Sequence, residues 1–169
     1  VLNGIAKNIQ KTDGEGETGK RSIAFSKYRY TLENFNFNRN YPLNTVLKVG
    51  VTGQIDRDAL TAKVMMPRIN TETDLLNIQR LPYFRFILSL GAVSDLKYNT
   101  DSNSYEPAVR EMHGVSVVVT GDWVPSENLL PEQELEVELG DEFKSICTEE
   151  VSLVLSVAIE FGKVGFTGQ

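Results

Sequence analysis

A glycine-rich segment over residues 14–20 carries the most suggestive chemistry in this sequence. It reads Gly-Glu-Gly-Glu-Thr-Gly-Lys and matches G-x-G-x-x-G as well as the opening of G-x-x-x-x-G-K-[ST], two patterns of phosphate-binding loops. A phosphate cradle also needs a buried strand before the loop, a helix after it and a hydroxyl after the lysine. Here the preceding residues are polar and helical, Arg21 stands at the hydroxyl position, and Glu15 and Glu17 would repel phosphate. We therefore predict a flexible Gly-rich linker over residues 13–20 that binds no nucleotide or other cofactor.

Three polar residues, Asn99, Asp101 and Asn103, have the spacing of the first ligands in a calcium-binding loop. Such a loop also requires a glycine at its sixth position and a glutamate at its twelfth, where this chain has Ser104 and Arg110. We therefore predict that the segment is a turn capped by its own side chains and that it binds no metal.

The residues that could serve in catalysis occur singly. His113 is the only histidine, and Cys147, the only cysteine, is followed by Glu149 and Glu150, whose charges disfavour a reactive thiolate. The two aspartates that flank Arg57 are typical of a charged hairpin turn. An enzyme would require a cleft that brings His113 together with carboxylates. We predict a non-enzymatic protein without catalytic residues.

Three aromatic residues, Trp123, Tyr105 and Tyr98, are the candidate binding residues. Exposed aromatic rings on the loops of a β-sandwich can stack on sugars or anchor a protein partner. Trp123, the only tryptophan, precedes a loop that contains proline. The interpretation that we favour for Trp123 is that it closes one end of the core. A carbohydrate-binding module that uses the three rings is the alternative.

The charges are unevenly distributed along the chain. The net charge is −6, yet residues 1–63 hold ten Lys/Arg against six Asp/Glu, whereas residues 64–169 hold seven against seventeen. The two parts should attract each other. We favour packing of the basic N-terminal part on its own acidic body over docking on the next molecule in a head-to-tail assembly. The acidic total and the sparse basic residues argue against a nucleic-acid partner.

The clearest structural element is a strand over residues 151–161. Apolar side chains alternate there with mostly small or polar ones, as expected for a strand with one buried face. The apolar positions are Val151, Leu153, Leu155, Val157, Ile159 and Phe161. Residues 83–93 are apolar on both faces, which predicts a central strand.

The N-terminal part has a different pattern. Apolar residues at helical spacing predict a short amphipathic helix over residues 2–11. Residues 22–37 fit neither the helical nor the strand period, and Ser22 could cap a helix that runs to about Leu32. The asparagines and the proline of residues 34–44 mark a boundary.

The remaining strands are predicted from alternation and turn residues. We expect a hairpin of residues 47–51 and 60–66 with its turn near residues 57–59, and a second hairpin of residues 95–98 and 104–109 with its tip at residues 99–103. Residues 115–120 should form a short buried run and residues 124–131 a loop. Residues 135–139 should form a strand whose glutamates face solvent.

These seven or eight strands, joined without helical crossovers, predict a mainly β fold. The expected architecture is an antiparallel, immunoglobulin-like two-sheet sandwich with a short helical N-terminal segment, and a β-barrel is the alternative. We expect a helical or irregular arm over residues 1–44 and the sandwich domain over residues 45–169. No run is apolar enough to span a membrane, and residues 1–10 are too polar for a signal-peptide core.

A set of spaced turn and strand residues extends over most of residues 30–161. It consists of Asn34-Phe35-Asn36-Phe37-Asn38, Leu43, Ile55-Asp56-Arg57, Pro67, Pro82, Phe84-Arg85-Phe86 and residues 153–161. This set resembles an uncharacterised family of Bacteroidota proteins. The resemblance implies a basic helical N-terminal region before a β-rich domain and a bacterial source. It implies no activity, cofactor or site residue.

The function that we expect is that of a structural or interaction protein, with self-assembly through an N-terminal arm that docks on a neighbouring sheet edge. We expect a protein partner, either a second copy or another chain, rather than a glycan. We also expect a soluble chain. Export or association with a surface is compatible with the sequence, and the single cysteine leaves the redox compartment open.

Overall fold

Strands make up most of the regular structure. The computed structural model describes residues 2–14, 16–17 and 19–163. Within these residues eight strands have four or more residues and three have two, which confirms the mainly β prediction. The strands are β1 (Thr52–Asp56), β2 (Thr61–Met66), β3 (Ile69–Asn70), β4 (Tyr83–Ser94), β5 (Leu96–Asn99), β6 (Ser104–Pro107), β7 (Ser116–Thr120), β8 (Val124–Pro125), β9 (Leu129–Leu130), β10 (Gln133–Glu138) and β11 (Val151–Gly162). The helices are α1 (Leu2–Thr12), α2 (Leu43–Val46), α3 (Thr71–Asp74) and the 3-10 helices η1 (Phe25–Lys27), η2 (Arg29–Leu32), η3 (Arg110–Met112) and η4 (Asp141–Phe143).

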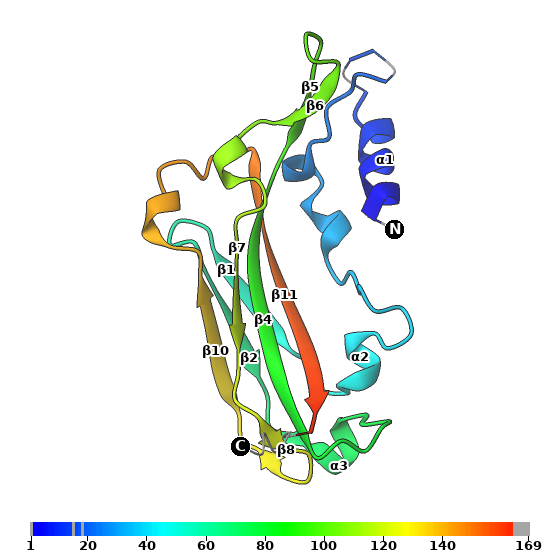
Figure 1. Cartoon of the computed structure of the whole chain (residues 1–169), viewed down its shortest axis with the longest axis vertical. Coiled ribbons are helices and arrows are strands. Elements are labelled where there is room, and N and C mark those ends of the chain that lie inside the picture. The colour runs from blue at the N-terminus through cyan, green and yellow to red at the C-terminus, as the bar shows by residue number, and fades with distance from the viewer. Residues whose placement is uncertain (1, 15, 18, 164–169) are drawn as a thin grey trace, which may run out of the picture.

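Two antiparallel sheets form the body of the molecule (Figure 1). The first has the strand order β1-β2-β10, and the second has the order β11-β4-β7, with β8 also paired to β4. Two further ribbons, β3–β9 and β5–β6, accompany them. Among the described residues no sheet closes into a barrel, so the barrel alternative is wrong.

The two sheets share one hydrophobic core. Val64 on the first sheet and Phe84 and Leu88 on the second belong to the same buried cluster. The sheets approach each other closely where β1 faces β11. A Cβ atom placed on Gly53 would lie 2.9 Å from Leu155 Cδ2, so the absence of a side chain on β1 lets β11 approach at this point.

β4 is the central strand that the sequence predicts. It pairs with β11 along its full length, from Val151↔Ser94 to Gly162↔Tyr83. Its other edge pairs with β7 and β8. Alternate side chains of β4 are buried, beginning at Phe84. β11 therefore has a paired strand on one side only, and among the described residues it is the last strand of its sheet.

β10 confirms the prediction of a strand with solvated glutamates. Val137 is buried, whereas Glu134 and Glu136 are exposed. Lys63 Nζ on β2 lies 2.8 Å from Glu134 and 3.8 Å from Glu136. The hydrogen bond and the charge of Glu134 raise the pKa of Lys63. Carboxylates along a strand at the edge of a sheet oppose pairing with another strand.

The first hairpin is displaced along the chain relative to its prediction. β2 agrees, but β1 begins at Thr52, after the predicted range of 47–51. All residues of β1 are exposed, so no apolar alternation marks this strand. The apolar residues of 47–51 pack against the core without joining the ladder. Asp56 Oδ1 closes the turn by accepting bonds from Asp58 N and Ala59 N at 3.0 and 2.9 Å.

The α-helix expected over residues 22–32 does not form. Two short 3-10 helices, η1 and η2, take its place, and Ala24 rather than Ser22 precedes the first of them. Residues 22–32 lie against the ends of β4, β5 and β11, where contacts with the body decide the local conformation over intrinsic helix propensity.

Residues 115–120 form a strand, but the prediction that they are buried is wrong. β7 lies at the edge of its sheet, and four of its five residues are exposed, including Val118. An apolar run alone cannot distinguish a central strand from an edge strand. The loop predicted over residues 124–131 contains the two short strands β8 and β9.

The predicted N-terminal helix is confirmed as α1, with Ile9 buried. The Gly-rich residues 13–20 form no helix or strand where they are described, and Glu15 and Thr18 of this predicted linker lie outside the described residues.

The segment that follows the linker packs on the body of the same chain. Ile23 forms an isolated bridge with Leu96. Ser26 donates from N and from Oγ to the buried carboxylate of Asp95, at 2.8 and 2.5 Å. These contacts give an intramolecular place to the basic N-terminal part.

Candidate functional site

The outer edge of β11, which faces away from β4, is the candidate functional site. In an antiparallel pair the backbone groups of successive residues point alternately toward the partner strand and away from it. Glu150 O accepts a hydrogen bond from Asp95 N, so Val151 and every second residue after it direct their backbone groups outward. The N–H and C=O groups of Ala92 form hydrogen bonds on the β7 side of β4, not on the β11 side. The N–H and C=O groups of Leu153, which lies opposite Ala92, therefore point away from β4.

Within residues 2–14, 16–17 and 19–163, no strand lies beside the outward-facing backbone groups of β11. They belong to Leu153, Leu155, Val157, Ile159 and Phe161. Within the described part of the chain, no group forms a hydrogen bond with the N–H or C=O of these residues. β11 is therefore an open strand edge, the kind of surface to which a further strand can be added.

The side chains along this open edge are apolar and half-buried. The five residues that direct their backbone outward also direct their side chains toward the core, where they pack against its buried members. None of the five is fully buried, because no strand covers their outer side. An added strand would bury more of this apolar row as well as satisfy the backbone groups.

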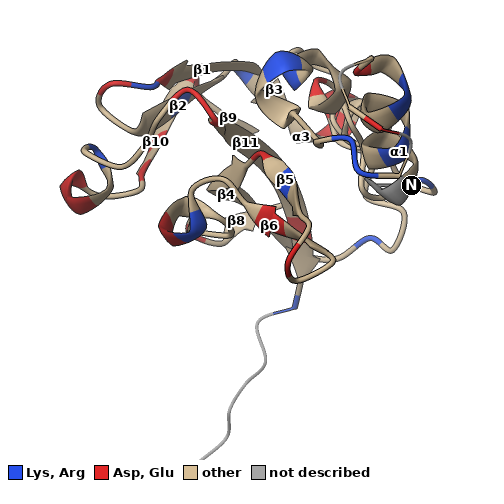
Figure 2. Ribbon diagram, turned by 90° about the horizontal axis from the view of Figure 1, so that it is seen from above, with Lys and Arg blue, Asp and Glu red and all other residues tan. Residues whose placement is uncertain are grey.

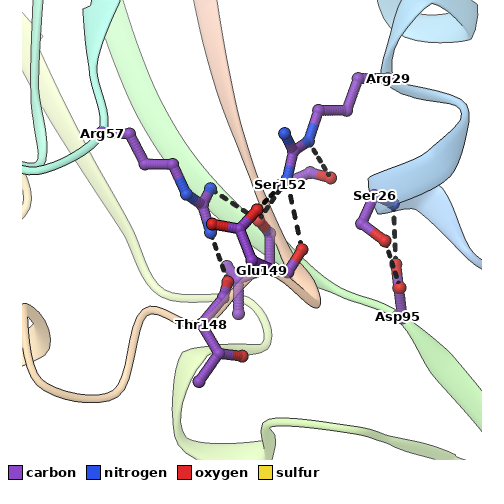
Figure 3. A network of polar contacts seen from close by, with 8 residues as sticks. Ser26, Arg29, Arg57, Asp95, Thr148, Glu149 and Ser152 are labelled. Atoms are coloured by element: carbon purple, nitrogen blue, oxygen red, sulfur yellow. Dashed lines mark hydrogen bonds and ion pairs between the residues drawn. The ribbon is translucent and has the colours of Figure 1, made fainter.

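Two arginines close the edge at the start of β11 (Figure 3). Arg57 Nη1 and Arg29 Nη2 both donate to Val151 O, at 2.8 and 3.4 Å. Arg57 also donates to Thr148 O, and Arg29 donates to Glu149 O at 3.2 Å. The first outward-facing carbonyl of β11 is thus satisfied by side chains, and the open stretch begins after it.

Neighbouring contacts position each of these arginines. Arg57 stands in the β1–β2 turn that the Asp56 carboxylate closes. Arg29 begins η2, shortly after the Ser26–Asp95 contact, and its Nε donates to Ser152 Oγ at 3.4 Å. The ion pair between Arg29 and Glu149 is longer, at 3.9 Å, and lies in solvent, so its contribution to stability is small.

A segment on the same side of the molecule as β11 connects η2 to α2 (Figure 1). We call residues 33–41 the strap. Asparagine alternates there with larger side chains, among them Phe35, Phe37 and Tyr41, and this is the period of a strand. The strap nevertheless forms no strand, and Phe37 is 70% exposed and Tyr41 48% exposed.

Asparagine side chains hold the strap in turns. Asn38 Oδ1 accepts bonds from Asn40 N and Tyr41 N, both at 3.1 Å, and Asn36 Oδ1 accepts from Leu43 N at 2.9 Å. Side-chain bonds of this kind take the place of ladder bonds. The sequence predicts a boundary over residues 34–44 and no period was assigned to residues 22–37, although the alternation within residues 33–41 is a signal that could have identified the strap.

The structure brings together two of the three predicted binding residues. Tyr98 and Tyr105 lie opposite each other on β5 and β6, with ring centroids 5.3 Å apart. Tyr105 Oη accepts from Gln10 Nε2 at 2.8 Å and donates to Gly19 O at 3.2 Å. Trp123 directly precedes β8, at the opposite end of the body from β5 and β6 (Figure 1).

Trp123 is covered on one face and is 37% exposed. Arg85 Cζ lies 4.3 Å from the ring centroid, in the geometry of a cation–π contact. A Cβ atom placed on Gly162 would lie 2.5 Å from the indole, so the ring packs directly on the backbone of β11. A sugar that stacked on the face beneath Arg85 would have to displace the guanidinium.

The other residues singled out from the sequence have local roles. His113 is exposed, and Cys147 is half-buried against the core, as its packing interpretation predicts. Asn99 Oδ1 accepts from Asp101 N and Ser102 N at 2.9 and 3.4 Å, which confirms the side-chain-capped turn. In the part of the chain that is described, no three His, Cys, Asp or Glu residues are grouped so that they could hold a metal ion.

Comparisons with known proteins return no match: no family model, no curated protein and no solved structure is similar to this chain. Of the helices that the structure describes, none has both the length and the apolar character needed to cross a membrane.

Proposed function

We propose that this chain is a non-enzymatic structural protein that assembles with other copies of itself by strand addition. In this proposal the body is an immunoglobulin-like two-sheet sandwich, and the open edge of β11 receives the strap of a second copy. The observation that carries the proposal is the run of unpaired, outward-facing backbone groups from Leu153 to Phe161.

The contrast between β11 and the other sheet edges supports this proposal. A long, open, apolar edge promotes unwanted pairing, and natural proteins protect such edges with charges or keep them short. β10 carries exposed glutamates, and β1 and β7 are shorter, with five residues each. β11 has twelve residues, and its outward-facing row contains no charged side chain. An edge of this kind is suited to a partner strand.

A second copy of the chain is the partner because the chain carries a matching segment. An extended strap would place its aromatic side chains, such as Phe35 and Phe37, on one face and its asparagines on the other. The aromatic row would meet the half-buried row of β11, as cross-strand neighbours do in a sheet. The strap lies within the N-terminal arm of residues 1–44, so this pairing is a specific form of arm docking.

Light scattering over a range of protein concentrations tests the proposal with variants of Val157. The N–H of Val157 points away from β4, so Val157→Pro removes one donor from the open edge without removing a bond to β4. Val157→Ala shortens the side chain but keeps the N–H and is the matched control. We expect Val157→Pro to weaken assembly at least tenfold and Val157→Ala to weaken it much less.

A second pair of variants tests the strap. Phe37→Ser removes an exposed aromatic side chain of the strap, and Ile78→Ser removes a similarly exposed apolar side chain elsewhere. Assembly should weaken for Phe37→Ser and stay unchanged for Ile78→Ser. A wild-type chain that is monomeric at every concentration and ionic strength contradicts the proposal, as does a Val157→Pro variant that assembles like the wild type.

A further inference from the structure

A pocket outside the β11 edge lies where α1, the Gly-rich segment and β6 meet. Its volume is about 320 Å³, within the range of about 300–1,000 Å³ that is usual for small-molecule pockets. The residues that line it are Lys7, Gln10, Lys11, Gly19, Arg21 and Tyr105.

The lining of this pocket is strongly basic. Of the described residues that line it, Lys7, Lys11 and Arg21 are cationic and none is acidic. Lys7 and Lys11 are one helical turn apart on α1, and within the described residues neither forms an ion pair or a side-chain hydrogen bond. Figure 2 shows ribbon coloured for Asp or Glu close to α1 in that view. Glu17, the glutamate of the Gly-rich segment that the structure describes, pairs with Lys20 at 3.1 Å and is not part of the lining. Positive charges that lie close together repel one another, and an anion in the pocket would relieve that repulsion.

Hydrogen bonds hold the polar wall of the pocket in place. Gln10 Nε2 donates to Tyr105 Oη at 2.8 Å, and Tyr105 Oη donates to Gly19 O at 3.2 Å, so three segments of the chain are joined at the pocket. Arg21 is held through Nε, which donates to Gly16 O at 3.3 Å, and through Nη1, which lies 3.5 Å from Gln10 O. A guanidinium group has five N–H donors, so Arg21 keeps donors for a ligand.

We propose that this pocket binds a phosphate group, either as free phosphate or as the phosphate of a small phosphomonoester. A phosphate dianion matches a cluster of cations, its oxygens accept hydrogen bonds from the fork of Arg21, and Lys7 and Lys11 act as point charges. The pocket has room for a small group attached to the phosphate.

The proposed site is not the loop that the G-x-x-x-x-G-K pattern predicts. Lys20, the lysine of that pattern, forms an ion pair with Glu17 at 3.1 Å and does not line the pocket. The cations that do line it come from α1 and from Arg21, and no buried strand precedes the glycines. The expectation that residues 14–20 form no nucleotide-binding loop is unaffected.

Isothermal titration calorimetry at low ionic strength, with protein prepared in phosphate-free buffer, tests the proposal. One arm uses inorganic phosphate and the other uses ribose 5-phosphate. The pocket variant is Lys7→Gln/Lys11→Gln. The control variant, Arg68→Gln/Arg80→Gln, removes the same charge from two exposed positions outside both the pocket and the strap. Circular dichroism checks that both variants keep the fold.

We expect saturable phosphate binding by the wild type, weakened at least tenfold in the pocket variant and less than twofold in the control. Equal binding of the two ligands would identify the phosphate group as the whole determinant, and tighter binding of ribose 5-phosphate would show that the pocket also contacts the sugar. No saturable binding of either ligand by the wild type overturns the proposal, and so does equal weakening in both variants. The result is independent of the assembly experiment.

Discussion

The carbonyl oxygen of Val151 marks the point at which β11 changes from a closed edge to an open one. Arg57 and Arg29, which are far apart in the sequence, both donate to it. The following outward-facing carbonyl groups have no donor among the described residues. At the scale of single residues, the two arginines therefore determine where a partner strand can begin to pair.

Arg57 is the stronger of the two contacts, and its removal should be measurable. Hydrogen bonds from a charged donor contribute about 1.5–3 kcal/mol, and the partly exposed position of Arg57 reduces this. We expect Arg57→Ala to lower the free energy of unfolding by about 1–2 kcal/mol. Urea denaturation gives the value, with Arg39→Ala as the control at an exposed position. A midpoint equal to that of the wild type would show that the bonds to Val151 O and Thr148 O contribute nothing.

The β1–β2 hairpin shows how one element positions the edge of another. Its turn carries Arg57 to the start of β11, although the hairpin belongs to the other sheet. The turn itself depends on the Asp56 carboxylate, which accepts two backbone bonds. A hairpin whose strand β1 has only exposed residues thus contributes, through Arg57, to holding the start of β11.

Variants of the two aspartates in this turn separate hydrogen bonding from charge. Asp56→Ala removes the acceptor of both backbone bonds, so we expect a loss of about 0.5–1.5 kcal/mol in unfolding free energy. Asp56→Asn keeps an acceptor and should retain most of the stability. Asp58→Ala removes the same charge two residues away. Among the described residues the Asp58 carboxylate forms no hydrogen bond, so this variant should leave the free energy of unfolding nearly unchanged. Similar losses for Asp56→Ala and Asp58→Ala would mean that charge, not turn geometry, is responsible.

Strands with an apolar pattern could be predicted from the sequence even where, as in β7, the structure leaves them exposed, and β1, which has no such pattern, could not. β11 is predicted from apolar alternation and β4 from residues that are apolar on both faces, and side chains of both strands reach the core. β1 could not be predicted from apolar alternation, because every residue in it is exposed. The helix predicted over residues 22–32 failed for a related reason, since contacts such as Ser26 with Asp95 lie outside any local pattern.

At the scale of the whole molecule, the position of β11 at the end of its sheet could not be predicted from the sequence. Its alternation is the same whether one neighbour or two are present, because the pattern records which face is buried and not which edge is paired. The pocket at α1 could not be predicted from the sequence either, because Lys7 and Arg21 line it together with Tyr105, which comes from a distant hairpin. The strap could have been identified from the sequence, because asparagine alternates with larger residues over residues 33–41, but only a boundary was predicted there.

The distribution of charge along the sequence also predicts the structure only in part. The attraction between a basic N-terminal part and an acidic remainder could be read from the sequence, but the contacts that serve it could not. In the structure the buried contact is a hydroxyl and an N–H of Ser26 on the Asp95 carboxylate, while the ion pair of Arg29 with Glu149 is long and exposed. The charge pattern therefore predicts that the N-terminal part packs on the rest of the chain better than it predicts the hydrogen bonds and ion pairs that join them.

Residue-resolved amide hydrogen exchange along β11, at low and at high protein concentration, tests the central claim most directly. At low concentration the amides of Ser152, Val154, Ser156, Ala158 and Glu160, which face β4, should be protected, and those of Leu153, Leu155, Val157, Ile159 and Phe161 should exchange quickly. At high concentration the second set should become protected as a strap from another copy pairs with the edge. Equal protection of both sets at low concentration, or fast exchange of the second set at every concentration, would contradict the account.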